Sequence, residues 1–414
     1  MVARVLLFTT ISLCLRAGLG LRCKNEAGTE VDWWFMIKYP DAASSSLGGA
    51  YYSAMDSESK SWTASSTSVE SSSSILGVNL DPIYASPKGD ISYVFYSDQH
   101  PDGTWTRDYG HSKGVIAYDS ASGFFLQHSV PKFPNYVDKG YHYGSGQEKF
   151  GQHALCVSLE LTTLDQVAFV MKYAHPWVYD SHLAAAPQMA NVSDVVKEVN
   201  FNATASSIDL TISTSNSLGD LRLFGKTALY NKDMMDSVVA PALKFDLWSQ
   251  SWLNSGGTLG AYCPKGFSVL DVQTANFGSA TEPWKTNDDH SKWAIAPTSD
   301  WVCGNDNNRV YSQFERSGLS ICFQQPDIHS VLKSGTKKEG NCGPSPGPSP
   351  TPPGGECCYY KDATCKVGDV CCKSACKNPF TCSYTEEGCS GRYGQKHHCT
   401  WQNDTCFVGS SATM

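Results

Sequence analysis

The chain has 414 residues, of which 41% are hydrophobic and 17% are charged, so it can bury a large core and form more than one domain. Its 40 acidic and 32 basic residues give a net charge of −8 at pH 7, which argues against a polyanionic ligand at that pH. Protonation of its 11 histidines reverses this balance, so the composition tolerates nucleic acid far better under acidic conditions.

The N-terminus has the features of a secretory signal peptide. Arg4 precedes an apolar run at residues 5–15, and small residues lead to Gly20. The run is too short to cross a bilayer, and no later segment has the required length. We therefore expect a signal peptide at residues 1–20 and a mature protein without stable membrane insertion.

Hydrophobic patterning after residue 20 indicates a layered domain of strands and helices. Apolar and aromatic runs predict strands at 31–39, 91–96, 114–118, 123–128 and 208–212. Residues 164–173 have helical spacing and follow a predicted N-cap at Thr162 or Thr163, and a weaker helix is predicted at 234–243. A Ser-rich stretch at 44–74 lacks periodicity and is interpreted as a surface loop. The fold class predicted for residues 21–342 is α/β, or layered α+β.

A segment rich in Pro, Gly and Ser at 343–355 separates this domain from a small one at 356–414. Ten cysteines in the small domain predict a disulfide scaffold of unknown role. His397 and His398 beside Cys399 leave a metal site open as an alternative. Its aromatic residues could form a carbohydrate or surface ligand site, although a small core is the favoured interpretation.

Cysteine usage fits an oxidising compartment. Cys14 belongs to the signal peptide, and the remaining 16 divide into six up to Cys342 and ten beyond it. The N-glycosylation pattern occurs at Asn191, Asn202 and Asn403, which also suits secretion.

The triplet His-Ser-Lys occurs twice, at His111 to Lys113 and at His290 to Lys292. An imidazole can attack phosphorus or donate a proton, and a lysine two residues later can hold a phosphate oxygen on the same face of a strand. Two copies supply one histidine for each task. Chance produces such triplets in a chain of this composition, so the surrounding residues must decide.

The surrounding residues resemble the deoxyribonuclease II family from about Cys23 to Lys333. The resemblance rests on YGHSKGV, GFFLQHSVPKFP and DDHSKW, together with VDWWFMIKYP, SGQEKFGQHALCVS and WVYD. It implies an endonuclease that cuts DNA under acidic conditions without a metal or other cofactor, leaves 3′-phosphate and 5′-hydroxyl ends, and acts in lysosomes or secretions. It also implies a phospholipase D-like pseudo-dimer of two related halves. Its disulfides would be Cys23–Cys156, Cys263–Cys342 and Cys303–Cys322.

The chain departs from the superfamily pattern His-x-Lys-x4-Asp. Tyr118 and Pro297 occupy the positions of the expected aspartates, so Asp119 and Asp300 are only candidates for the acids that orient the histidines. His128 matches a histidine that the family shares. It either lines the site or is a hydrogen-bonded histidine of the core.

The mechanism expected from these residues proceeds through a phosphohistidine. Either His111 or His290 attacks phosphorus, and the other histidine protonates the leaving oxygen. Three alternatives remain open. Asp288 and Asp289 could bind a metal, the chain could be a secreted toxin or binding protein on an inactive nuclease scaffold, or it could be a lipid phosphodiesterase. Trp293 could stack a base, but packing is the favoured interpretation.

Overall fold

The computed structural model describes residues 20–342, apart from 44–47, 145, 186, 202–204, 255–256 and 279–281, and four short strands nearer the C-terminus. The segment 1–19 of the predicted signal peptide, the predicted linker and most of the cysteine-rich domain lie outside the described residues, as do Asn202 and Asn403. Among the described helices, none is long and apolar enough to cross a membrane.

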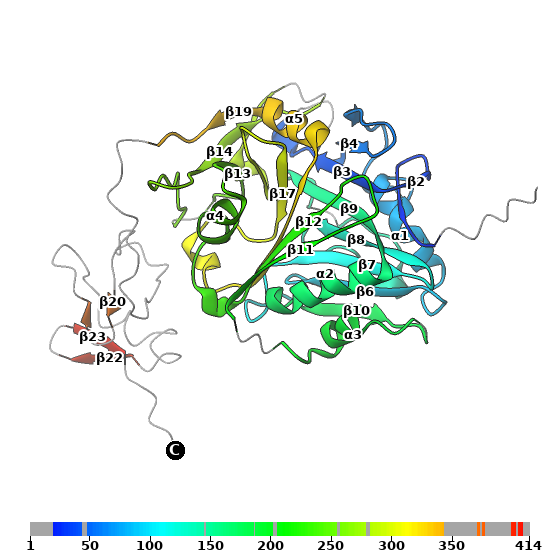
Figure 1. Ribbon diagram of the computed structural model, residues 1–414, viewed down its shortest axis with the longest axis horizontal. Coiled ribbons are helices and arrows are strands. Elements are labelled where there is room, and N and C mark those ends of the chain that lie inside the picture. The colour runs from blue at the N-terminus through cyan, green and yellow to red at the C-terminus, as the bar shows by residue number, and fades with distance from the viewer. Residues whose placement is uncertain are drawn as a thin grey trace, which may run out of the picture.

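Two large sheets make up the main body (Figure 1). The first has eight strands in the order β10-β6-β7-β8-β9-β3-β4-β5. Its bounds are β3 Trp33–Lys38, β4 Tyr52–Asp56, β5 Thr63–Ala64, β6 Ser92–Ser97, β7 Lys113–Tyr118, β8 Ser122–His128, β9 Gln152–Glu160 and β10 Val178–His182.

The second sheet has nine strands in the order β11-β12-β18-β17-β16-β13-β14-β15, with β19 paired to β14. Its bounds are β11 Ser207–Ile212, β12 Leu221–Lys226, β13 Leu247–Gln250, β14 Val269–Ala275, β15 Trp284–Lys285, β16 Trp293–Ile295, β17 Trp301–Asn305, β18 Gly318–Gln324 and β19 Thr336–Glu339. Three two-stranded pairs complete the strands: β1 Cys23–Lys24 with β2 Glu30–Val31, β20 Cys371–Cys372 with β21 Ala375–Cys376, and β22 Cys399–Gln402 with β23 Thr405–Val408.

Helices pack against both sheets. Their bounds are α1 Ile75–Ala85, α2 Leu161–Ala174, α3 Ala190–Lys197, α4 Ala240–Leu243 and α5 Pro326–Gly335. A π-helical turn, Met235–Val239, leads directly into α4, so the predicted helix at 234–243 is confirmed in outline. The predicted strands correspond to β3, β6, β7, β8 and β11, and the mixed α/β class is confirmed.

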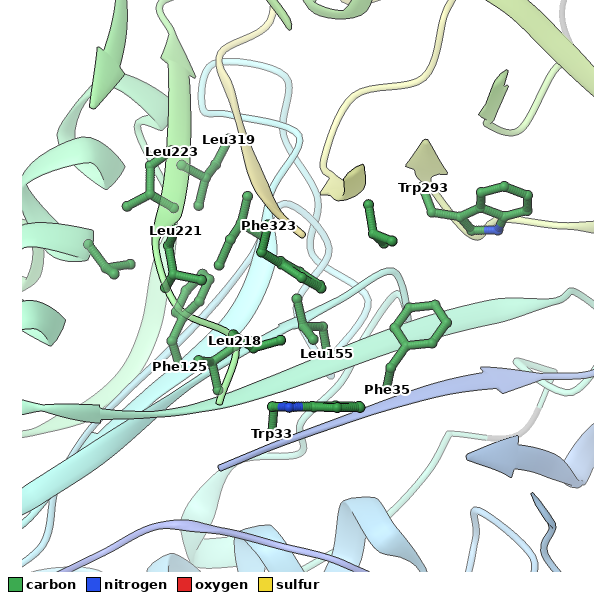
Figure 2. Packing of buried hydrophobic residues seen from close by; sticks show 14 of the residues in the cluster. Trp33, Phe35, Phe125, Leu155, Leu218, Leu221, Leu223, Trp293, Leu319 and Phe323 are labelled. Atoms are coloured by element: carbon green, nitrogen blue, oxygen red, sulfur yellow. The ribbon is translucent and has the colours of Figure 1, made fainter. Parts of the chain in front are cut away.

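The largest hydrophobic cluster lies between the two sheets. Figure 2 shows Trp33 and Phe125 of the first sheet packing beside Leu223 and Phe323 of the second. A second cluster covers the outer face of the first sheet with α1, and a third covers the second sheet with α4. Strand β3 is therefore buried on both faces, which explains why it is apolar without alternation.

Two predictions were wrong: the interpretation of the Ser-rich stretch as a surface loop, and the start of the helix that follows β9. The Ser-rich stretch contains β4, in which Tyr52 and Met55 are buried, so its serine content hid a core strand paired along β3. Helix α2 begins at Leu161, because β9 runs into it through Glu160 without a threonine cap.

The three disulfides join the pairs that the family resemblance implied: Cys23 with Cys156, Cys263 with Cys342, and Cys303 with Cys322. The first attaches β1 to β9, and the third crosses the neighbouring strands β17 and β18. Each constrains the unfolded chain and so stabilises the folded one.

Candidate active site

Each His-Ser-Lys triplet lies where a central strand begins. Lys113 is the first residue of β7, and Lys292 immediately precedes β16. The amide of His111 donates to the carbonyl of Ser317 at 3.0 Å, and the amide of His290 donates to the carbonyl of Gly151 at 2.8 Å. Each triplet is therefore anchored by the residue that immediately precedes a strand of the other sheet, β18 for His111 and β9 for His290.

The two lysines are buried within electrostatic reach of each other. Burial, and then the charge of Lys113, lower the pKa of Lys292 to about 7. Burial lowers the pKa of His111 well below its usual range, and Lys113 and Lys292 add to this effect; burial and both lysines likewise lower the pKa of His290. The structure thus brings together the histidines and lysines of both triplets, although the triplets are 179 positions apart (290 − 111) in the sequence.

His111 lies in charged surroundings. Its Nδ1 is 3.0 Å from the carbonyl oxygen of Asp306, and its Nε2 is 3.8 Å from Oδ2 of Asp98. Asp98 is buried, contacts Lys113 and accepts a 3.0 Å bond from Arg316. Despite burial, the charges of Lys113, His111 and Arg316 hold the pKa of Asp98 below its usual range, so it stays ionised in acid.

His290 lies in aromatic surroundings. Its ring stacks on Phe150 with centroids 4.0 Å apart and planes 14° apart, and Trp252 lies at 4.3 Å. Burial, followed by the charges of Lys292, Lys113 and Lys38, lowers the pKa of His290 to about 2. The imidazole is therefore neutral in the absence of substrate.

These two environments occupy matching positions in the two sheets. Ser97, just before Asp98, pairs with Lys113, and Gln250, two residues before Trp252, pairs with Trp293, the residue after Lys292. Asp98 and Trp252 therefore correspond. Arg316 and Phe150 also correspond, since each precedes the residue whose carbonyl anchors a triplet. We call Asp98 and Arg316 the charged pair, and Phe150 and Trp252 the aromatic pair.

Two more histidines line the same region. His128 ends β8, is buried and hydrogen-bonds to no side chain; burial and then Lys113 lower its pKa to about 3. His153 on β9 accepts a 3.0 Å bond at Nδ1 from the amide of Lys292. Burial and then Lys292 hold its pKa well below normal. The structure places His128 in a buried position within electrostatic reach of Lys113, and its catalytic role stays a prediction.

Asp306 links the two sheets behind His111. It accepts bonds from the amide of Leu319 at 2.9 Å and from Nε2 of Gln127 at 3.1 Å. Gln127 needs the space that Gly304 leaves, because a Cβ there would lie 2.4 Å from its Oε1. Burial raises the pKa of Asp306 to about 7, so this carboxyl titrates near neutrality.

Comparison with known proteins identifies the chain. The sequence model of the family described as Deoxyribonuclease II matches residues 22–342. The chain belongs to the deoxyribonuclease II family. It is a deoxyribonuclease by that membership. It is 33% identical to Deoxyribonuclease-2-alpha of Mus musculus over 325 residues, which cover 76% of this chain and 91% of that protein.

Two further relatives extend the comparison. Deoxyribonuclease-2-beta of Rattus norvegicus is 30% identical over 78% of this chain and 93% of its own length. Plancitoxin-1 of Acanthaster planci is 29% identical over 80% of this chain and 97% of its own length. All three alignments span most of the chain.

The structure places the candidate acids of this deoxyribonuclease away from the roles the spacing suggested. Asp119 accepts bonds from the amides of Leu21, Ala121 and Ser122, and Asp300 lies 4.0 Å from His329. Asp98 is instead the carboxylate beside His111. Spacing rules did not find it because it precedes the triplet in the sequence and directly follows the neighbouring strand β6.

Other sequence candidates have structural partners. Asp289 is buried and accepts bonds from Trp284 and from the amide of Ser291, and no group of three or more metal-ligating residues occurs in the described part of the chain. Trp293 is fully buried in the core, as the packing interpretation predicted. The side-chain nitrogen of Asn191 donates to Asp165 at 2.9 Å.

Proposed function

We propose that this protein is a metal-independent acid endodeoxyribonuclease that hydrolyses DNA to 3′-phosphate and 5′-hydroxyl ends. One triplet histidine attacks phosphorus and forms a phosphohistidine, while the other protonates the departing 5′-oxygen; water activated by that second histidine then releases the product. Lys113 and Lys292 hold the non-bridging oxygens. The observation that carries the proposal is the meeting of both triplets, each anchored by the residue that precedes a strand of the opposite sheet.

Two groups of the site support acid activity. Lys292 and Asp306 both have a pKa of about 7. As the pH falls from 8 to 5, Lys292 becomes positive and Asp306 becomes neutral. Both changes make the site more positive, which favours binding of the phosphodiester anion.

The proposal includes a phospholipase D-like arrangement of two related halves. Its support is the matching order of elements: β6, triplet with β7, β8, β9 and α2 in one half, and β13, triplet with β16, β17, β18 and α5 in the other. The matched anchoring bonds of His111 and His290 add to that support.

We also propose a secretory route that ends in the lysosome or outside the cell. Three disulfides in the described body support maturation in an oxidising compartment. The cysteine-rich segment at 356–414 would then provide attachment to a carbohydrate or surface ligand, separate from catalysis.

The decisive assay incubates supercoiled plasmid with the full chain in excess EDTA from pH 4 to pH 8. We expect cleavage that is maximal near pH 5, with 5′ ends that a polynucleotide kinase labels directly and 3′ ends that a polymerase cannot extend. Loss of cleavage in EDTA would establish a metal-dependent nuclease. Absence of DNA cleavage at every pH would overturn the proposal, and headgroup release from phospholipid vesicles would then identify a lipid phosphodiesterase.

A further inference from the structure

The two catalytic histidines have different neighbours, and the first difference is at His111. A carbonyl oxygen only accepts hydrogen bonds, so the contact of Nδ1 with the Asp306 carbonyl requires a proton on Nδ1. Nε2 is left as the reactive nitrogen, 3.8 Å from the carboxylate of Asp98. That carboxylate favours a proton on Nε2, because it stabilises the imidazolium.

The charged pair holds this carboxylate in place. Arg316 donates to Asp98 at 3.0 Å, and its other terminal nitrogen donates to three carbonyls, those of Thr106, Tyr109 and Gly110. Arg316 is therefore fixed by the loop that leads into the first triplet. A rotation of Asp98 away from His111 would break its bond with Arg316.

His290 has the opposite environment. Phe150 and Trp252 pack against its ring. Burial lowers its pKa, and the charged groups that lower it further are Lys292, Lys113 and Lys38. The carboxylate of the adjacent Asp289 is directed to Trp284 and to the amide of Ser291. These surroundings disfavour an imidazolium and keep a lone pair available.

We infer that His290 is the nucleophile and His111 the general acid, with Asp98 and Arg316 as positioning residues that keep the proton on Nε2 of His111. The inference rests on the proposed function. Burial lowers the pKa of His111 well below its usual range. Among the charged groups around it, Lys113, Arg316 and Lys292 lower that pKa further, and Asp98 opposes them. A bound phosphodiester anion pairs with both lysines, which relieves their repulsion at both histidines and leaves Asp98 as the difference.

The steps balance in protons and bonds. A ring nitrogen of neutral His290 bonds to phosphorus, the bond from phosphorus to O5′ breaks, and His111 transfers its Nε2 proton to O5′. Water then attacks phosphorus and gives a proton to His111, and the P–N bond breaks. The 3′-phosphate leaves, His290 is neutral again, and His111 again carries its proton.

A substrate with an activated leaving group separates the two roles. In thymidine 3′-(4-nitrophenyl phosphate), nitrophenolate replaces the 5′-oxygen and departs without protonation. In single turnover at pH 5, we expect His111→Ala and Asp98→Asn to lower the rate of DNA cleavage by about 10²-fold or more. The rate of nitrophenolate release should stay within about tenfold of that of the unmodified protein. His290→Ala should lose both reactions. His111→Ala should also accumulate phosphohistidine at His290, mapped by peptide mass spectrometry.

Matched variants exclude trivial causes. Asp209→Asn breaks the exposed ion pair with Arg222 and should leave both reactions unchanged. If His111→Ala does not fold, as judged by thermal unfolding, His111→Gln replaces it. The inference would be overturned by any of three results. These are a burst of nitrophenolate with His290→Ala but not with His111→Ala, a phosphate group found on His111, or an equal loss of both reactions in both variants. If the unmodified protein fails to cut DNA to 3′-phosphate ends in EDTA, the proposed function itself fails.

Discussion

The charged pair and the aromatic pair occupy corresponding positions around two identical triplets, yet one places a carboxylate beside its histidine and the other places two aromatic rings there. Burial and then the nearby lysines lower the pKa of both histidines, and at His111 the carboxylate of Asp98 opposes this lowering. A phosphodiesterase that uses two histidines needs one neutral and one protonated. A repeated motif can therefore serve two roles when its neighbours differ, and the motif alone does not reveal which copy has which role.

The largest expected effect comes from removing either histidine. His111→Ala and His290→Ala should each lower plasmid cleavage at pH 5 by about 10³-fold or more, because each lacks either the nucleophile or the proton donor. The measurement is initial nicking rate in EDTA, with circular dichroism as the control for folding. A variant that keeps rates near those of the unmodified protein would remove that histidine from the mechanism.

The next effect tests the charged pair through stability. Arg316→Met removes one of the cationic partners of buried Asp98 and leaves Lys113 and His111, so we expect it to lower the free energy of unfolding by about 3 kcal/mol. Phe150→Leu removes one stacking partner of His290 and should cost only about 1 kcal/mol. Denaturant titrations at pH 7 measure both values. Equal losses in the two variants would contradict the energetic distinction between the pairs.

The exposed pair Arg222–Asp209 provides the control for that experiment. Both of its side chains are partly exposed, at 25% and 36%, so solvent screens their attraction. Arg222→Met should therefore change the free energy of unfolding by less than about 1 kcal/mol.

The aromatic pair predicts a pH-dependent effect of smaller size. His290 has a pKa of about 2 in the folded chain, so below about pH 6.5 the unfolded chain binds a proton there that the folded chain does not. This difference lowers stability as the pH falls. His290→Phe keeps an aromatic ring between Phe150 and Trp252 and removes the titration. Without DNA, it should gain about 2 kcal/mol relative to the unmodified protein between pH 8 and pH 5.

His111→Phe is the matched comparison for the pH experiment. It loses the contact with the Asp306 carbonyl and leaves Asp98 without its imidazole neighbour. We expect a relative gain on acidification here as well, because burial and then Lys113 lower the pKa of His111 well below its usual range. Absence of this gain in the His111→Phe variant would show that the carboxylate of Asp98 cancels the lowering of the His111 pKa.

The sequence predicted the components of this site better than their arrangement. The strands leading into and away from the first triplet were predicted within about one residue, because each is a short apolar run between polar turns. Asp98 and Arg316 are 218 positions apart, and no local spacing connects them. Phe150 and Trp252 look like ordinary core residues in the sequence. Their role depends on the strand pairing of two sheets, which one sequence does not specify.

Asp119 provides the last and smallest test, because spacing nominated it for the role that the structure gives to Asp98. Its carboxylate accepts bonds from the amides of Leu21, Ala121 and Ser122 and so secures the turn between β7 and β8. Asp119→Asn keeps one acceptor oxygen and should cost about 1 kcal/mol of stability. The rate of DNA cleavage at pH 5 should stay within twofold of the unmodified protein. A large loss of rate in a folded Asp119→Asn variant would instead assign the role of orienting His111 to Asp119.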